Sequence, residues 1–301
     1  MKIIVSGSSG LIGSALIDSL RPDGHSIARL VRSGSTATAD VTSKMIRWEP
    51  PSGSIDLEAM EGADAVVSLA GASVAGGRWT TERKQILRRS RVDATRHLVG
   101  SLAQLKTKPR VFVSASAIGY YGSRGDEVLN ETSAPGNDFL AHLCRDWEAE
   151  AAKAEHEGIR TVMLRFGIVL AAHGGALQQM LRPFRLGVGG RLANGRQWMS
   201  WVTLEDVVAI IRYAITNDSP RGPVNTVAPN AVTNAEFTSI LAEVLHRPAL
   251  FPAPRLALRV ALGEMADALL ASQRVMPEKL TELGYTFRHS ELKEALGSIL
   301  D

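Results

Sequence analysis

The sequence predicts an α/β protein whose parallel sheet is doubly wound, with helices on both faces. Over residues 1–165, short apolar runs rich in β-branched residues alternate with longer segments whose apolar residues recur at helical spacing. The runs are continuously apolar, as in Ile3-Ile4-Val5, and strands buried on both faces have this composition. Together, these two observations predict a sheet that is covered by helices on both sides.

Each element of this domain has its own signal. Six short apolar runs are predicted as parallel strands, over residues 2–6, 26–31, 45–48, 65–69, 110–114 and 161–165. Three segments with helical periodicity are predicted as helices, over residues 11–20, 82–105 and 139–156.

The pattern changes after Arg165, where Gly and Pro divide the chain into short pieces. Residues 166–301 are predicted to form a smaller region, with helices over 203–216 and 233–245 that each begin at a potential capping Thr. Glu205 and Asp206, in the first turn of the former helix, are interpreted as capping residues rather than acids. Helices over 256–271, 277–283 and 291–300 predict a helical appendage from about residue 250 to 301.

Composition excludes several classes of protein. The 301-residue chain is 45% hydrophobic and 22% charged, which is typical of globular proteins and not of fibrous or disordered ones. Its net charge of +3 is too small to indicate nucleic-acid binding, and no apolar stretch is long enough to predict a membrane span. An N-terminus without a signal peptide and a single cysteine, Cys144, predict a cytoplasmic protein.

The strongest motif lies directly between the first strand and the first helix. Three glycines spaced by two residues permit a tight turn, close approach of a pyrophosphate and packing of the helix on the strand. The N–H groups at the start of the helix then face the phosphates. The motif predicts dinucleotide binding, the alternative being a glycine-rich turn without a ligand. Its residues are Gly7, Ser8, Ser9, Gly10, Leu11, Ile12 and Gly13.

Two further segments extend the predicted cofactor site. Arg32 and Ser33 follow the second strand, where an Arg suits the 2′-phosphate of NADP and an acidic residue would suit NAD. They favour NADP(H), with NAD left open, and the alternative is a solvated arginine. Leu69, Ala70 and Gly71 follow the fourth strand, where small residues let adenosine and ribose lie against the backbone; an ordinary strand-to-loop turn is the other interpretation.

With these motifs, Ser114-Ala115-Ser116-Ala117-Ile118-Gly119-Tyr120-Tyr121-Gly122 makes the chain resemble the extended short-chain dehydrogenases/reductases. More narrowly, it resembles the NAD-dependent epimerase/dehydratase-like branch with a C-terminal domain of unknown function, often labelled nucleoside-diphosphate-sugar epimerases. The resemblance covers nearly the whole chain. It implies a Rossmann-like domain over residues 1–165, a substrate-binding region over 166–301, and a nicotinamide cofactor that Ser114 helps to bind.

The resemblance does not supply the catalytic residues. Active members use a Ser and a Tyr-x-x-x-Lys pair, in which Lys lowers the pKa of Tyr and holds the nicotinamide ribose. Ser116 matches the serine, but Leu140 and Cys144 stand where Tyr and Lys belong. Tyr120 and Tyr121 are the nearest titratable candidates for proton transfer; the alternative is that each ring is buried with its hydroxyl bonded to a backbone carbonyl.

Two other side chains on the helix over 139–156 carry possible chemistry. His142 is a further candidate for proton transfer, and Cys144 is interpreted as inert packing because no His or metal-ligand spacing accompanies it. No metal site is expected.

Basic side chains are concentrated between residues 78 and 110, and most are predicted to form a solvated helix face. These include Arg83, Arg88, Arg89 and Arg96. Arg91 instead shares the apolar stripe of Leu87 and Leu98, so it needs a carboxylate, backbone carbonyls or a bound anion as partner. Arg91 is therefore a candidate substrate-binding residue. Trp79 and Trp201 are candidates as walls for a flat ligand, or are core aromatics.

Two hypotheses of function follow. The first is an NADP(H)-binding epimerase or oxidoreductase that transfers hydride on a nucleotide sugar or another small carbonyl or hydroxyl compound, with Ser116 polarising the substrate oxygen. The second is a catalytically silent protein that senses NADPH or binds a partner when NADPH is bound. A small-molecule substrate is expected, with no nucleic acid or membrane as partner, and a homodimer is compatible with the superfamily.

Overall fold

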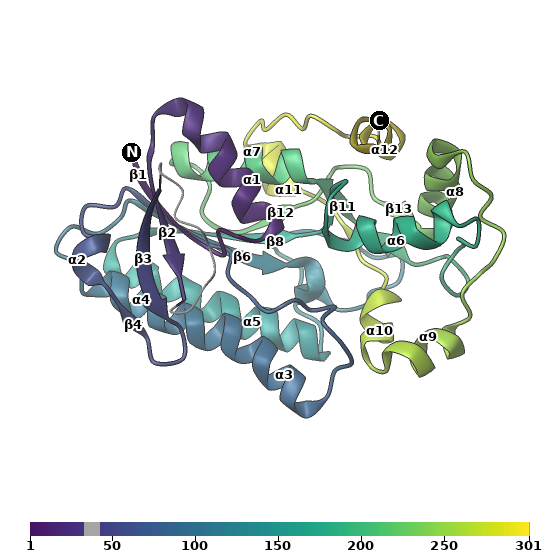
Figure 1. The fold of residues 1–301 in the computed structure, drawn as a ribbon, viewed down its shortest axis with the longest axis horizontal. Helices are drawn as coiled ribbons and strands as arrows, with labels where there is room; N and C mark the ends of the chain where they lie inside the picture. Colours follow the sequence, from purple (N-terminus) through teal and green to yellow (C-terminus); the bar gives the residue numbers. More distant parts are fainter. Residues whose placement is uncertain (33–42, 301) are drawn as a thin grey trace.

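The computed structural model describes residues 1–32 and 43–300, so Ser33 lies outside the described residues. Within them, the main sheet has eight strands in the order β12-β8-β6-β5-β1-β2-β3-β4 (Figure 1). Every pairing in it is parallel except that of β3 with β4. The strands are β1 (Lys2–Ser6), β2 (Ser26–Val31), β3 (Ser43–Glu49), β4 (Ser54–Ile55), β5 (Ala65–Ser68), β6 (Val111–Ala117), β8 (Arg160–Phe166) and β12 (Gly222–Thr226). The predicted fold class is confirmed.

All six predicted strands are present with bounds that differ by at most a few residues, and β12 is the main strand that the sequence did not indicate. It begins with Gly222, at a φ of 64°, and Pro223, and both residues are unusual inside strands. Val224 is buried, however, and β12 pairs with β8 in parallel from Gly222 to Thr226.

Helices cover both faces of the sheet (Figure 1). On one face lie α1 (Leu11–Leu20) and α7 (Leu204–Thr216), and on the other α3 (Thr81–Arg88), α4 (Ala94–Ala103) and α5 (Phe139–Ala152). The predicted helix over 82–105 is interrupted between α3 and α4 by a π-helical turn, η2 (Arg89–Asp93). No helix among the described residues combines the length and the apolar composition needed to cross a bilayer.

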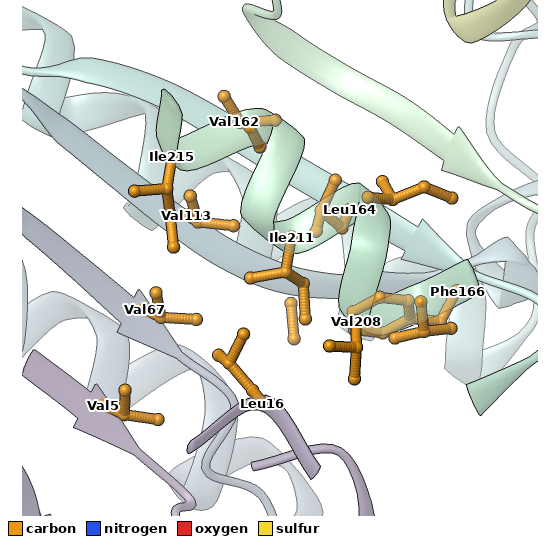
Figure 2. Packing of buried hydrophobic residues seen from close by; sticks show 14 of the residues in the cluster. Val5, Leu16, Val67, Val113, Val162, Leu164, Phe166, Val208, Ile211 and Ile215 are labelled. Carbon is orange, nitrogen blue, oxygen red and sulfur yellow. The ribbon is translucent and has the colours of Figure 1, made fainter. Parts of the chain in front are cut away.

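Successive side chains along each strand point to opposite faces of the sheet and so pack into two cores. Figure 2 shows Val208, Ile211 and Ile215, spaced along one face of α7, packed over strand side chains such as Val113 and Leu164. Each such buried side chain stabilises the fold by about 1.5–3 kcal/mol. The intervening strand residues face α4 and α5 in a second core.

Residues 166–301 divide between this sheet and a second body. Although α7 and β12 follow residue 165, both pack on the sheet, and the domain boundary at 165 stays a prediction. A separate core, which includes Leu177, Trp201, Phe237 and Leu296, joins α6 (Gly175–Arg185), α8 (Asn234–Leu245) and α12 (Leu292–Leu300). The remaining elements are α2 (Leu57–Met60), β7 (Val128–Leu129), β9 (Ile168–Leu170), β10 (Trp198–Met199), β11 (Trp201–Thr203), β13 (Val232–Thr233), α9 (Arg255–Leu262), α10 (Met265–Leu269), β14 (Arg274–Val275) and α11 (Glu278–Glu282).

The start of α7 joins the sheet to the C-terminal segment. Thr203 Oγ1 accepts a hydrogen bond from the Asp206 backbone N–H at 3.1 Å, which is the predicted cap. The carboxylate of Asp206, with no exposed surface, accepts the backbone N–H groups of Arg288 at 2.9 Å and His289 at 3.1 Å. Asp206 therefore has a structural role, whereas Glu205 is exposed and pairs with the Arg288 and His289 side chains.

These two neighbouring carboxylates are expected to contribute differently to stability. Asp206→Ala should lower the free energy of unfolding by about 3 kcal/mol, because two backbone N–H groups lose a charged, buried acceptor. Glu205→Ala removes only exposed ion pairs and should lower it by about 1 kcal/mol or less. Urea denaturation of both variants measures the difference, and equal losses would contradict the assignment.

Candidate functional site

The glycine-rich loop between β1 and α1 forms the centre of a cleft at the carboxyl edge of the sheet. Gly7 has a φ of +68°, and a Cβ there would lie 2.6 Å from the carbonyl carbon of Leu69. A Cβ on Gly13 would lie 2.3 Å from the carbonyl oxygen of Gly7, so only glycine lets α1 approach this closely. Gly10 at the N-cap has no side chain to cap α1, and the N–H groups of the first turn are suited to an anion.

One half of the cleft is a cavity of about 890 Å³ between the glycine-rich loop, the end of β2 and the helix from α3 to α4. Ser8, Ser9 and Arg32 line it, and their binding of the cofactor stays a prediction. Arg89 and Arg96, which the sequence placed on a solvated face, are exposed and also line it; Arg96 is paired with Asp93 and Glu150. Three arginines therefore line this half of the cleft, and of these Arg32 and Arg89 form no ion pair with a described carboxylate.

The other half is a cavity of about 570 Å³ that extends past Ser116 toward α5 and α10. Its lining is mostly apolar, with Leu140, Cys144 and Phe166 among the residues. Polar groups on its wall come from Arg91, Ser116, Asp138 and Gln273. The two halves share Gly7, Gly10, Leu69, Ala70 and Gly71, so they form one continuous cleft.

Most of the residues predicted to bind cofactor or substrate, and the predicted catalytic residue Ser116, line this cleft. They are Gly7, Ser8, Ser9, Gly10, Leu11, Ile12, Gly13, Arg32, Leu69, Ala70, Gly71, Arg91 and Ser116. Ser114 does not, which corrects its assignment to the cofactor: it has no exposed surface, and its hydroxyl bonds to the Ala115 carbonyl within β6. His142 is exposed on the outer side of α5 and does not line either cavity.

Ser116 is held by a buried ion pair that the sequence did not reveal. Its hydroxyl donates to Glu148 Oε1 at 2.6 Å. Arg165 holds the same carboxylate with two bonds, Nε to Oε1 at 2.8 Å and Nη2 to Oε2 at 2.7 Å. Burial alone would lower the pKa of Arg165, but its bonds to Glu148 raise that pKa above the ordinary value. The guanidinium stays charged, and the proton of Ser116 is directed to Glu148.

The two tyrosines support this ion pair and do not line the cleft. The Tyr121 hydroxyl donates to Asn225 Oδ1 at 2.7 Å and accepts from Arg165 Nη1 at 2.9 Å, and the side chain has no exposed surface. Burial raises the pKa of Tyr121 to about 12. The Tyr120 ring centroid lies 3.6 Å from the Arg165 guanidinium carbon. The prediction that either tyrosine transfers a proton is therefore corrected: both pack on Arg165.

Of the two interpretations of the tryptophans, the core one is correct for Trp201, whereas Trp79 is partly buried and packs against the edge of the core. Trp201 has no exposed surface, and its indole N–H donates to the Asn230 carbonyl at 2.9 Å. Trp79 donates to the Val74 carbonyl at 3.0 Å and packs edge-on against Phe139, 5.4 Å between ring centroids. Neither lines the cleft, so their assignment to substrate binding is corrected.

Leu140 and Cys144 face the cleft at the positions where the resemblance would place Tyr and Lys. Burial raises the pKa of the Cys144 thiol to about 12; the charge of Glu148 also raises it and that of Arg91 lowers it. The thiol is therefore neutral at ordinary pH. In the described part of the chain, no three His, Cys, Asp or Glu side chains come together as metal ligands.

The fold and the loop are those of NAD(P)-binding Rossmann-like proteins. The chain belongs to the NAD dependent epimerase/dehydratase family: residues 3–227 match the model of that family, and residues 253–299 match a domain of unknown function, DUF1731. The family resemblance predicted from the sequence is thereby confirmed.

Relatives match along the whole chain. The epimerase family protein Mb2239 of Mycobacterium bovis is 42% identical over 296 residues, which cover 98% of this chain and 96% of that protein. The chloroplastic homolog of epimerase family protein SDR39U1 from Arabidopsis thaliana is 38% identical, over 100% of this chain and 87% of that protein.

Solved structures extend the comparison. The human epimerase family protein SDR39U1 with NADPH is 30% identical with a TM-score of 0.88, and the match covers 99% of both chains. MoeE5 in complex with UDP-glucose and NAD is 23% identical with a TM-score of 0.75, over 99% of this chain and 97% of that chain, which shows the shared fold alone.

The buried ion pair predicts a large loss of stability on neutralising Glu148. Glu148→Gln leaves the Arg165 guanidinium buried without a counter-charge and should lower the free energy of unfolding by about 3–5 kcal/mol. The matched control is Glu150→Gln on the same helix, because the cations that Glu150 binds, Arg96 and Lys153, are solvent-exposed. It should lose about 1 kcal/mol or less. Similar losses in both variants, measured by urea denaturation, would contradict the assignment.

The raised pKa of Cys144 predicts slow reaction with thiol reagents. Because only the thiolate reacts and its fraction rises as pH approaches the pKa, a group with pKa about 12 is almost entirely protonated at pH 8. Reaction of the native protein with 5,5′-dithiobis(2-nitrobenzoate) at pH 8 should be about a thousandfold slower than that of the protein unfolded in guanidinium chloride. Comparable rates would show that the thiol is accessible and ionised.

Proposed function

We propose that this protein binds NADP(H) along the cleft and transfers hydride between the cofactor and a small hydroxyl or carbonyl compound held beside Ser116. The observation that carries the proposal is the continuity of the two cavities over the glycine-rich loop, with Arg32 and Arg89 at one end and Ser116 at the other. That the human relative was solved with NADPH supports the choice of cofactor.

The residues present fit a dinucleotide with a 2′-phosphate. The N–H groups at the start of α1 would hold the pyrophosphate. The small residues Ala70 and Gly71 would lie against the ribose and adenine, and the guanidinium groups of Arg32 and Arg89 would bind the 2′-phosphate. The bound nicotinamide ring supplies a carbon that accepts or gives a hydride.

Ser116 gives the substrate oxygen a route for its proton. Ser116 lines the cleft, and because its proton is donated to Glu148, its oxygen would act on a ligand as an acceptor, which suits a substrate hydroxyl better than a carbonyl. When such a hydroxyl is oxidised, its proton passes to Ser116 Oγ while the serine proton passes to the Glu148 carboxylate. Nucleotide sugars and other small polyols carry such hydroxyls.

A second candidate function is an NADPH-dependent sensor without turnover. It is favoured by Leu140 and Cys144, which make the wall of the cavity apolar where proton-transfer groups would be needed. Single-turnover experiments separate the two candidates: NADP⁺ reduction and NADPH oxidation are followed at 340 nm across panels of nucleotide sugars, polyols and carbonyl compounds. Turnover of any member supports the enzyme, and tight NADPH binding without turnover supports the sensor.

Preference for the phosphorylated cofactor should depend on Arg32. Loss of a charge-assisted contact with the 2′-phosphate should weaken NADPH binding by about 10- to 100-fold in Arg32→Ala, with NADH binding unchanged. Arg89→Ala should act in the same direction. Calorimetric titration of both cofactors measures this, and Arg88→Ala is the control because Arg88 pairs with Asp146 outside the cleft. Unchanged NADPH binding in both Arg32→Ala and Arg89→Ala would contradict the phosphate site.

A further inference from the structure

Arg91 is a cation on the cleft wall without an acidic partner. Its Nη2 donates to the Ala72 carbonyl at 3.0 Å, and Nη1 reaches the Leu87 carbonyl at 3.5 Å and Ser90 Oγ at 3.4 Å. No carboxylate of the described residues forms an ion pair with it, whereas Arg88 on the same helix pairs with Asp146 at 2.6 Å. All its partners are neutral, and two of its three bonds are long.

The partly buried charge of Arg91 would be stabilised by a further hydrogen-bond acceptor, which the described part of the chain does not supply. Transfer of a charged group from water into protein is unfavourable unless strong hydrogen bonds replace its hydration. Burial accordingly lowers the pKa of Arg91, although the residue stays protonated. Arg91 lines the cavity that Ser116 also lines. A ligand in that cavity can therefore complete its hydrogen bonding.

The backbone at Arg91 departs from a regular helix. Arg89–Asp93 form the π-helical turn η2 between α3 and α4, and such single turns inside α-helices are frequent at functional sites. On one side of Arg91, Leu87 is fully buried, and on the other side Leu98 is as well. The helix is therefore anchored in the core on both sides of the irregular turn that carries the guanidinium.

Arg91 lies in the half of the cleft that contains Ser116, where the proposed function places the nicotinamide. Its guanidinium lies so close to Gly71 that a Cβ there would be 3.1 Å from Cζ. It also lies 5.4 Å from the Trp147 ring centroid, and its charge acts on the Cys144 thiol. Arg91 lines the cavity of Ser116 and Cys144, and not the one that contains Arg32.

We propose that Arg91 supplies, from the turn between α3 and α4, the positive charge that α5 lacks at Cys144. Its guanidinium donates hydrogen bonds to the ribose hydroxyls of the nicotinamide half of NADP(H) and to the adjoining phosphate. This assignment rests on the proposed binding of NADP(H). Gly71 belongs to the same arrangement, because a larger residue there would clash with the Arg91 guanidinium.

Two probes of the cleft test the assignment by calorimetry. NADPH fills both halves, whereas 2′,5′-ADP carries the adenosine and 2′-phosphate and lacks the nicotinamide riboside. In Arg91→Leu, NADPH binding should weaken by about 10- to 100-fold, while 2′,5′-ADP binding should change much less. Arg91→Lys keeps a cation and should retain most of the NADPH affinity. Arg88→Leu, an exposed arginine of the same helix, should change neither.

A rescue variant separates ligand binding from a purely structural role. Replacing Cys144 by Lys in the Arg91→Leu background returns a cation to the same cavity and should restore NADPH affinity by about tenfold. If the only role of Arg91 were to hold the loop at Ala72 in place, a cation at position 144 would not restore NADPH binding. If the double variant does not fold, the contrast between Arg91→Lys and Arg91→Leu serves instead.

The outcomes distinguish failure of this inference from failure of the proposed function on which it rests. If the wild-type protein binds neither NADPH nor 2′,5′-ADP, the proposed function fails. If wild type binds both and Arg91→Leu binds NADPH equally well, the assignment of Arg91 is overturned. It is also overturned if Arg91→Leu loses both probes to the same degree, because that result indicates a general disturbance of the cleft.

Discussion

The buried pair of Arg165 and Glu148 is the interaction on which the arrangement of the cleft depends. Arg165 lies near the end of β8, Glu148 lies on α5, and Ser116 near the end of β6 donates to the same carboxylate. Tyr121 links the guanidinium to Asn225 on β12. One ion pair thus fixes three neighbouring strands and a helix at the edge where ligands of parallel α/β sheets bind.

The same network ties the C-terminal segment to the sheet. The Asn225 side chain donates to the Met276 carbonyl at 2.9 Å, and Glu131 accepts the backbone N–H groups of Asn225 at 2.9 Å and Lys279 at 3.4 Å. Gln273, on the same C-terminal segment, donates to the Ile118 and Gly122 carbonyls and lines the cavity. Removal of either charge of the central pair would leave the other buried, which is far more unfavourable than loss of a surface pair. A substitution that breaks this ion pair would therefore disturb both the fold and the site.

The parts that the sequence predicted are those set by local physics. The glycine-rich loop, the strands on either side of it in the sheet and residues 69–71 could be predicted, because each depends on backbone requirements that act over a few neighbouring residues of the chain. Arg165 and Glu148 are 17 residues apart, and their meeting depends on how α5 packs on β8. Nothing in the spacing distinguished Glu148 from a solvated acid, although it lies one turn beyond Cys144 on the face of α5 that includes Leu140.

Arg89 and Trp201 show two other limits of prediction from sequence. Arg89 is exposed, as the sequence predicted, but the sequence did not indicate that this exposed face forms a wall of the cleft. Trp201 is equally suited by composition to a core or to a ligand wall, and only the packing of α6, α8 and α12 around it decides the question. In both cases the deciding information is tertiary.

The arginines of the chain divide into two groups according to their partners. Arg165 is bound to a carboxylate and stabilises the fold, because its charge is neutralised within the protein. Arg32, Arg89 and Arg91 line the cleft, and no described carboxylate forms an ion pair with any of them. Arg96 also lines the cleft but is paired with Glu150 and Asp93. Three cations without a described carboxylate partner, beside the N-terminus of α1, are electrostatically complementary to a ligand that carries several negative charges. Net charge alone, at +3, conceals this arrangement.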